Sequence, residues 1–546
     1  MIKPKSAPYF ALSYVWGNDA GALKTSLKTD KANLEAHLGP GAFDMGDKAR
    51  SLPRTPSDAM RLVKNLGGRY CWIDRLCIVQ DDMEQKEKLI QSMGLIYAQA
   101  YCTLIACNAD TPAHGLRGIS GGAPRVASQQ VLRFPTGDCV VLGKSRQDER
   151  QSHWNRRGWT FQERILSRRA LVFTRNSVSW SCQRNMWLED LTGDAEGHER
   201  SVIDAAAYSK FEICQWPNLV QWAQLLSIYN HRDLSFESDR VSAFAGIETA
   251  LNLSFPDGFF CGLPEAFFDL ALLWQPKSSM SRRRATTRQT SNHALPSWSL
   301  VGWKGIIDIK SLYPGLDYIR SNPEWLLRRR TSCVIKPLVE WCEIDASGRL
   351  QSKISNKYHA WRNAKCSDGG WMRFVDEDSK ETWYEHPLTG EATFWWPVPL
   401  KSAATLRPLS RQPFLKFRSS MGNLKIGETI PGLDLQTCVS ASLRDSNDKW
   451  VGCLRLPCPD RGFLPIGKMC ELVAISLGQA DNRQDESWIL EEWSTDQRPV
   501  DGPYYNFVNV LWVERDGEWI ERNACGRVEM ATWQRLNLEE REFKLR

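Results

Sequence analysis

Tyr70-Cys-Trp-Ile-Asp-Arg-Leu-Cys-Ile-Val-Gln-Asp-Asp82 is the stretch that decides the fold of the N-terminal part of this chain. Its aromatic, apolar run ends abruptly at Asp74 and Arg75. An upstream run, Tyr9-Phe-Ala-Leu-Ser-Tyr-Val-Trp-Gly17, ends in the same way at Gly17. Buried parallel strands have this pattern, because they deliver polar side chains to the crevice at their carboxyl ends. Both runs are therefore predicted to be strands of a parallel sheet that carries a site where they end.

The segments that follow alternate between helix and strand patterns. Thr55-Pro-Ser-Asp58 is typical of a helix start, with Thr as the N-cap and Pro at the first helical position. Asp82, with Gln85 three residues later, predicts a second helix start, and residues 101–107 form a third apolar run. This alternation favours right-handed crossovers between parallel strands. The N-terminal domain is therefore predicted to be α/β, a parallel sheet flanked by helices.

A third block, Arg157-Gly-Trp-Thr-Phe-Gln-Glu163, adds a carboxylate and an amide to the polar groups above. Two short apolar runs follow it, residues 170–174 and 178–182. They are joined through Arg175-Asn176, which predicts a β-hairpin.

The length of 546 residues exceeds what one hydrophobic core usually supports, so two or three domains are expected. We predict that the α/β domain covers residues 9–190. Residues 191–275 are predicted to be a helical extension, with 219–229 and 263–274 as the better helix candidates.

The remainder of the chain changes character twice. Residues 276–296 are rich in Ser, Thr and Arg and are predicted to be a basic linker or loop, with a phosphate-binding arm as the alternative. Residues 297–546 are predicted to be β-rich. Within them, residues 508–513 and 519–522 flank Arg515-Asp-Gly, which predicts a hairpin, and a short helix from Ala531 is expected to close the chain.

Composition excludes several classes of protein. A net charge of +6 over this length is too weak to imply nucleic-acid or membrane-surface binding. No run approaches about 18 consecutive apolar residues, so no membrane span is expected. The 16 cysteines contain no C-x-x-C pair, which favours a reducing, cytoplasmic location and no metal site.

The motifs occur together in an order that resembles a known family, the fungal heterokaryon-incompatibility (HET) domain. The resemblance covers residues 9–190 and rests on these blocks: Tyr9 to Gly17, Leu52-Pro53 with Asp58-Ala59, Tyr70 to Ile78 with Gln80-Asp81, Met93-x-x-Ile-Tyr97-x-x-Ala100, and Arg157 to Glu163 with Leu166-Ser167-x-Arg169. The first block begins nine residues into the chain, whereas relatives carry a longer lead, so a truncated N-terminus is one expectation.

The resemblance implies a role in non-self recognition between fungal individuals, with regulated cell death as the output. It also implies a distant relation to TIR domains, whose members include signalling adaptors and NAD-cleaving enzymes, and a TIR- or flavodoxin-like strand order. TIR enzymes use a helix-borne glutamate, and no acidic residue follows Tyr97 at the corresponding place. The catalytic residue therefore cannot be transferred directly.

The chemistry of NAD cleavage indicates which residues to examine. A carboxylate must stabilise an oxocarbenium-like centre or orient the ribose hydroxyls, in a dry pocket beside an aromatic ring. We expect Glu163 and Asp74 to be catalytic, with Asp74 contacting the ribose. The expected nucleotide-binding residues are Ser13, Trp16, Gly17, Arg75, Arg157 and Trp159, with either arginine facing the pyrophosphate. No cofactor is required, and NAD is the candidate substrate.

Each of these residues also has a structural interpretation. Asp74 could form a salt bridge with Arg75 or Arg157, and Glu163 could bond backbone groups. The tryptophans could belong to the core, and Gly17 could serve a turn that needs a positive φ. Two functions therefore remain open. One is a death effector that hydrolyses NAD or a related nucleotide; the other is a non-catalytic scaffold that signals by self-association or through a protein partner such as an incompatible allelic product.

Overall fold

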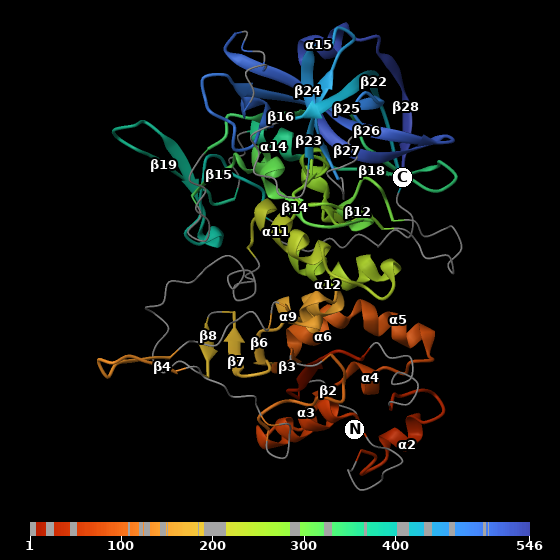
Figure 1. Cartoon of the computed structure of the whole chain (residues 1–546), viewed down its shortest axis with the longest axis vertical. Helices are drawn as coiled ribbons and strands as arrows, with labels where there is room; N and C mark the ends of the chain where they lie inside the picture. Colours follow the sequence, from red (N-terminus) through yellow and green to blue (C-terminus); the bar gives the residue numbers. More distant parts are fainter. Residues whose placement is uncertain are drawn as a thin grey trace. The chain divides into compact units, whose positions relative to one another are not determined.

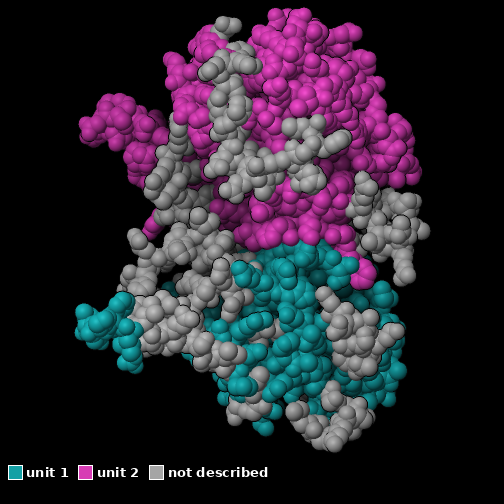
Figure 2. Space-filling view, in the orientation of Figure 1, with its two compact units in different colours: residues 1–212, 232–235, 242–247 teal, residues 213–231, 236–241, 248–546 magenta. Residues whose placement is uncertain are grey.

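The structure is a computed structural model that divides into two compact units (Figure 2): residues 1–212, 232–235 and 242–247 form unit 1, and residues 213–231, 236–241 and 248–546 form unit 2. It describes residues 7–17, 27–43, 52–107, 110–119, 124, 131–141, 149, 151–183, 185–189, 214–283, 295–321, 330–364, 369–400, 414–430, 439–457, 465–494, 498, 500 and 502–546. The predicted boundaries at 190, 275 and 296 stay predictions.

Unit 1 is built on a six-stranded sheet with the order β2-β1-β3-β6-β7-β8 (Figure 1). Four strands are parallel: β1 (Phe10–Ser13), β2 (Cys71–Trp72), β3 (Cys102–Ala106) and β6 (Arg169–Phe173). β7 (Val178–Cys182) and β8 (Met186–Leu188) are antiparallel, so the sheet is mixed and the predicted hairpin is confirmed as β6–β7. Because β7 is antiparallel where a doubly wound order places a fifth parallel strand, the TIR- or flavodoxin-like order stays a prediction.

Helices cover both faces of this sheet. Successive strand residues point to opposite faces, so Leu12 packs with α3 residue Val63, whereas Ala11 packs with α6 residue Tyr97. The helices described wholly within unit 1 are α2 (Leu34–Leu38), α3 (Arg54–Asn65), α4 (Asp74–Cys77), α5 (Met83–Gln91), α6 (Met93–Gln99), α8 (His153–Arg156) and α9 (Trp159–Ile165). The α/β class predicted for this part of the chain is therefore present. A separate hairpin, β4 (Val131–Arg133) and β5 (Cys139–Val141), also belongs to unit 1.

The two predicted helix starts had different outcomes. Asp82 is the N-cap of α5 and accepts a hydrogen bond from the Gln85 amide at 3.3 Å, as predicted. Thr55 is not the N-cap of α3, which begins at Arg54 after Pro53. The Thr55 hydroxyl instead accepts a hydrogen bond from the Gly115 amide, and no local pattern predicts this contact between residues 60 positions apart.

The β-rich C-terminal region of unit 2 is dominated by six long strands whose sheet closes on itself. Hydrogen bonds run from β22 through β25, β26, β27, β24 and β23 and back to β22. These strands are β22 (Phe414–Thr429), β23 (Val439–Arg444), β24 (Trp450–Leu456), β25 (Met469–Asp481), β26 (Tyr504–Asp516) and β27 (Trp519–Glu529). Aliphatic side chains fill the interior together with Trp533. The predicted hairpin around Arg515-Asp-Gly is confirmed as β26–β27.

Smaller elements extend this ring. β16 (Val334–Pro337) pairs with β25, and β17 (Cys342–Ile344) pairs with β22 and with β18 (Leu350–Lys353). The expected terminal helix is α15 (Met530–Arg535), but it does not close the chain. β28 (Glu539–Leu545) follows it and pairs with β22 and β27.

The rest of unit 2 is less helical than predicted. Residues 219–229 do form a helix, α11 (Leu219–Asn230). α12 (Arg240–Leu251) follows it, and residues 242–247 of α12 belong to unit 1. Residues 263–274 do not form one continuous helix: β10 (Leu263–Pro264) is followed by η4 (Glu265–Phe267) and by α13 (Phe268–Ala271). Pro264 pairs there with Phe259 in an antiparallel bridge to β9 (Phe259–Phe260).

The basic segment is a folded part of unit 2 as far as it is described. β11 (Gln275–Pro276) pairs with β14 (Ile307–Asp308), and β12 (Ser281–Arg282) pairs with β13 (Trp303–Lys304). Arg283 is buried and forms an ion pair with Glu237. The prediction of a solvated linker is therefore wrong for Arg282 and Arg283, and residues 284–294 lie outside the described part.

Unit 2 also contains a four-stranded sheet and several short helical segments. The sheet consists of β15 (Ile319–Ser321), β21 (Thr393–Phe394), β20 (Thr382–Glu385) and β19 (Met372–Val375). The other elements are α14 (Tyr358–Ala364), η3 (Glu237–Asp239), η6 (Leu300–Gly302), η7 (Ile309–Leu316), η8 (Pro387–Thr389) and η9 (Glu491–Ser494). Within the described ranges, no helix is long and apolar enough to cross a bilayer.

Candidate functional site

The carboxyl ends of β1 and β2 carry the polar residues that the sequence singled out. Ser13 is the last residue of β1, and Asp74 begins α4 two residues after β2 ends. Glu163 comes from α9, about 150 residues from Ser13 along the chain. Because β1 is flanked by β2 on one side and by β3 on the other, this edge is the reversal point of the strand order, where α/β folds usually place a site.

Glu163 is buried and held by β1. The Ser13 hydroxyl donates a short hydrogen bond to the Glu163 carboxylate, and Trp154 Nε1 donates to Ser13 Oγ at 2.8 Å. Burial, with a contribution from the charge of Asp74, raises the pKa of Glu163 to about 7, although Ser13 and Arg157 act in the opposite direction. A large fraction of this carboxyl group is therefore protonated at neutral pH.

Asp74 sits in a second cluster at the same edge. It accepts hydrogen bonds from Trp16 Nε1 at 2.8 Å and from the Arg75 backbone amide at 2.7 Å. Burial raises the pKa of Asp74 to about 6 against the effects of these bonds and of the positive charges of Arg157 and Arg75. The two carboxyl groups are close enough for the charge of Asp74 to raise the pKa of Glu163.

The structure thus brings Ser13, Trp16, Asp74, Arg75 and Glu163 into two linked clusters. Among the described residues, neither Arg75 nor Arg157 forms an ion pair with Asp74. The structural salt bridge considered from the sequence is therefore not present. The guanidinium of Arg75 instead stacks on Trp16, 4.7 Å from the ring centroid.

The remaining predicted residues have more peripheral roles. Gly17 is buried with φ +89°, as its interpretation as a turn residue requires, and a Cβ added there would lie 3.3 Å from Pro112 Cδ. Arg157 is half-buried and lowers the pKa of both carboxyl groups. Trp159 is the first residue of α9, and in the part of the chain that the structure describes no hydrogen bond joins its side chain to Asp74 or Glu163.

Sequence reasoning missed three residues of this site. Trp154 is fully buried and bonds Ser13, and the Tyr97 hydroxyl donates to the Leu12 carbonyl at 3.0 Å. The Tyr14 hydroxyl is buried without a hydrogen-bond partner among the described residues. Tyr97 lies in a quoted motif, and Trp154 comes just before the third block, but neither position reveals a bond to residues more than 80 positions away.

A cavity in the same unit does not coincide with this edge. It has a volume of about 570 Å³ and lies beside β6, β7 and β8, where Leu62, Phe173, Trp180 and Trp187 line it. It contains neither Asp74 nor Glu163. The candidate site is therefore defined by its clustered polar groups and not by this hollow.

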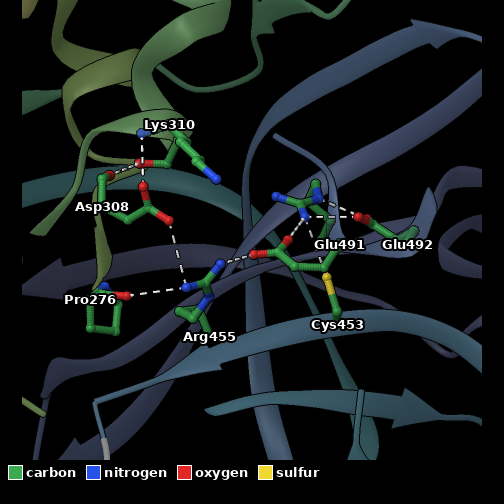
Figure 3. A network of polar contacts seen from close by, with 9 residues as sticks. Pro276, Asp308, Lys310, Cys453, Arg455, Glu491 and Glu492 are labelled. Carbon is green, nitrogen blue, oxygen red and sulfur yellow. Dashed lines mark hydrogen bonds and ion pairs between the residues drawn. The ribbon is translucent and has the colours of Figure 1, made fainter. Parts of the chain in front are cut away.

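One further group of side chains has metal-ligand chemistry, in unit 2 (Figure 3). Cys453 Sγ and carboxylate oxygens of Glu491 and Glu492 lie within 4.8 Å of one another. Both carboxylates are already bonded to arginines: Glu491 pairs with Arg455 and Arg527, and Glu492 pairs with Arg527 Nε at 2.7 Å. A cation would have to displace these guanidinium groups, so we assign this cluster a structural role.

Comparison with known proteins identifies the N-terminal part. Residues 9–163 match the family model of the Heterokaryon incompatibility protein (HET) family, so the chain carries a HET domain, and that domain includes every residue of the candidate site. No curated protein and no solved structure matched the chain.

Proposed function

We propose that the HET domain at residues 9–163 hydrolyses NAD or a related nucleotide, and that this activity drives regulated cell death in fungal non-self recognition. One observation carries the proposal. Two buried carboxyl groups with raised pKa values, Asp74 and Glu163, meet at the carboxyl edge of β1 and β2 beside the indole of Trp16. Acids held in this way are common in active sites and rarer elsewhere.

The proposed reaction assigns each residue a part. Water attacks C1′ of the ribose, the bond from C1′ to the nicotinamide nitrogen breaks, and the products are ADP-ribose, nicotinamide and a proton. Ionised Glu163 stabilises the positive charge that develops at the ribose, with Ser13 and Trp154 fixing its carboxylate. Asp74 orients the ribose hydroxyls, Trp16 and Trp159 offer ring faces, and Gly17 allows close approach of the backbone.

The protonation states set the working pH of this proposal. Only ionised Glu163 can stabilise a cationic centre, and its pKa is about 7. Loss of NAD is therefore expected to increase as the pH rises through about 7. Arg157, which favours the ionised forms of both acids, would assist.

The experiment is to follow NAD concentration after adding the purified full chain, at high protein concentration so that self-association is permitted. Glu163→Gln removes the charge with little change in shape, and Glu84→Gln, an exposed acid on α5, is the matched control. Turnover by the parent and the control, and at least a hundredfold less by a folded Glu163→Gln variant, would support the proposal. Absence of turnover in folded, assembled parent protein would reject it.

A second candidate function is a non-catalytic scaffold that signals by self-association or through a protein partner, such as an incompatible allelic product. One observation favours it: Glu163 is only 6% exposed and bonds Ser13, so the same carboxyl group also fastens α9 to β1. If this function holds, growth arrest on expression of the chain in a fungal host would persist in Glu163→Gln and disappear in variants that no longer assemble.

A further inference from the structure

Arg75 in the HET domain is buried without the partners that a buried guanidinium group needs. Its side chain is 1% exposed, and its Nε and Nη1 atoms have no hydrogen-bond partner among the described residues. No ion pair to Arg75 occurs there either. Leaving such donors unsatisfied in a protein interior is costly, so an exception of this kind calls for a ligand that completes it.

The surroundings hold this guanidinium group in place. It stacks on the Trp16 ring, whose Nε1 is fixed by Asp74 Oδ2 at 2.8 Å. The backbone of Arg75 is fixed as well, because its amide donates to Asp74 Oδ1 at 2.7 Å and its carbonyl accepts from the Thr29 amide at 3.1 Å. A donor group that is ordered before binding loses little conformational entropy when a ligand arrives.

The chemistry of the group selects the ligand. A guanidinium group is always charged, and the unpaired N–H donors on Nε and Nη1 of Arg75 call for an anionic acceptor such as a phosphate oxygen. Neither Asp74 nor Glu163 accepts a hydrogen bond from Arg75 Nε or Nη1. The missing acceptor is therefore supplied from outside this set.

We propose that Arg75 binds a phosphate group of the substrate, so that this site takes phosphorylated nucleotides and not nucleosides. The inference rests on the proposed function for the presence of a nucleotide at this edge. It adds the chemical class of the substrate and the orientation of its phosphate, next to the face of Trp16.

Binding calorimetry on the full chain tests this inference without requiring catalysis. The probes are ADP, adenosine and inorganic phosphate, each titrated into the parent, Arg75→Gln and Arg75→Lys. The control is Arg169→Gln, because Arg169 also stacks on an aromatic ring, 5.2 Å from the Tyr101 centroid, but is exposed at the start of β6. We expect ADP to bind the parent at least about tenfold more tightly than adenosine, the strength of a charge-assisted hydrogen bond.

The variants give the second arm of the test. Arg75→Gln is expected to lose the preference for ADP, Arg75→Lys to keep part of it, and Arg169→Gln to keep all of it. Equal binding of ADP and adenosine to the parent, or absence of ADP binding, would overturn the inference without any variant having to fold. Unchanged ADP affinity in Arg75→Gln would also overturn it. If inorganic phosphate binds as tightly as ADP, the site is a general anion site and the proposed substrate class is rejected.

The outcome is separable from that of the proposed hydrolysis. ADP binding through Arg75 in a chain that leaves NAD intact would keep the phosphate site and reject catalysis. Turnover of NAD with the same KM in the parent and in Arg75→Gln would keep catalysis and reject the phosphate site.

Discussion

At the scale of single residues, the burial of Glu163 links the stability of unit 1 to pH. The pKa of this carboxyl group rises from an ordinary value near 4.5 to about 7 on folding, so the folded state binds its proton more tightly than the unfolded state. The free energy of unfolding is therefore highest below about pH 4.5 and falls as the pH rises to about 7. Asp74, with a pKa of about 6, acts in the same direction.

Glu163→Gln tests this linkage, because an amide cannot ionise. The variant is expected to be more stable than the parent by about 3 kcal/mol at pH 8 and by less than about 1 kcal/mol at pH 5. Urea unfolding at both pH values measures the difference, with Glu84→Gln as the control. A variant that is less stable than the parent by the same amount at both pH values would contradict the linkage.

The electrostatic coupling of the two acids gives a second prediction. The charge of Asp74 raises the pKa of Glu163, so Asp74→Asn should lower it. If hydrolysis requires ionised Glu163, the rate of NAD loss in this variant should reach half of its plateau at a lower pH than in the parent. A pH profile with a reduced plateau and an unchanged midpoint would show that the two groups are not coupled.

The candidate site shows how far single residues can be inferred from sequence. Ser13, Asp74 and Glu163 were predictable because each belongs to a conspicuous local motif. The bond from Trp154 to Ser13 was not, because it spans 141 residues and no local pattern encodes it. The unsatisfied Arg75 depends on burial, which becomes visible only when the surrounding elements are placed.

At the scale of elements, unit 1 depends on the close approach of two helices. A Cβ added to Gly94 of α6 would lie 2.6 Å from the Gly246 Cα of α12, and one added to Gly246 would lie 2.7 Å from the Gly94 Cα. Gly94→Ala is therefore expected to destabilise unit 1 by about 1–3 kcal/mol, because backbone atoms cannot give way as a flexible side chain does. Chemical unfolding measures this against Gly39→Ala, whose added Cβ would have no neighbour nearer than 3.4 Å. Equal stability of the two variants would contradict the packing.

Elements were predictable from sequence where local signals decide them. The N-cap at Asp82 and the hairpins β6–β7 and β26–β27 follow from nearby residues. Residues 263–274 were predicted to be one helix, which is wrong. They are almost entirely buried, and a continuous apolar run lacks the alternation of apolar and polar faces that distinguishes a helix from other buried elements. The pairing of β22 with β25, which closes the sheet of unit 2, joins strands about 50 residues apart and has no sequence signature.

At the scale of the whole molecule, the two units should respond to pH in opposite directions. Burial raises the pKa of Glu491 in unit 2, but Arg455 and Arg527 outweigh it and hold the pKa at about 2 (Figure 3). This lowered pKa stabilises unit 2 above about pH 4.5, and the stabilisation is lost as the pH falls towards 2. Unit 1, through Glu163 and Asp74, gains stability as the pH falls from 7.

Hydrogen exchange of the full chain, measured peptide by peptide, reports the stability of unit 1 and of unit 2 separately. Glu491→Gln leaves Arg455 with one fewer charged partner and breaks a buried pair, so it is expected to destabilise unit 2 by about 3–5 kcal/mol. Exchange should accelerate in peptides from β24 and β27, which carry Arg455 and Arg527, and not in β1 or β3. Glu540→Gln, an exposed acid on β28, is the control. Equal acceleration in the peptides of both units would mean that the two cores unfold as one. The opposite pH responses would then merge into a single stability curve with its maximum near pH 4.5 or slightly below.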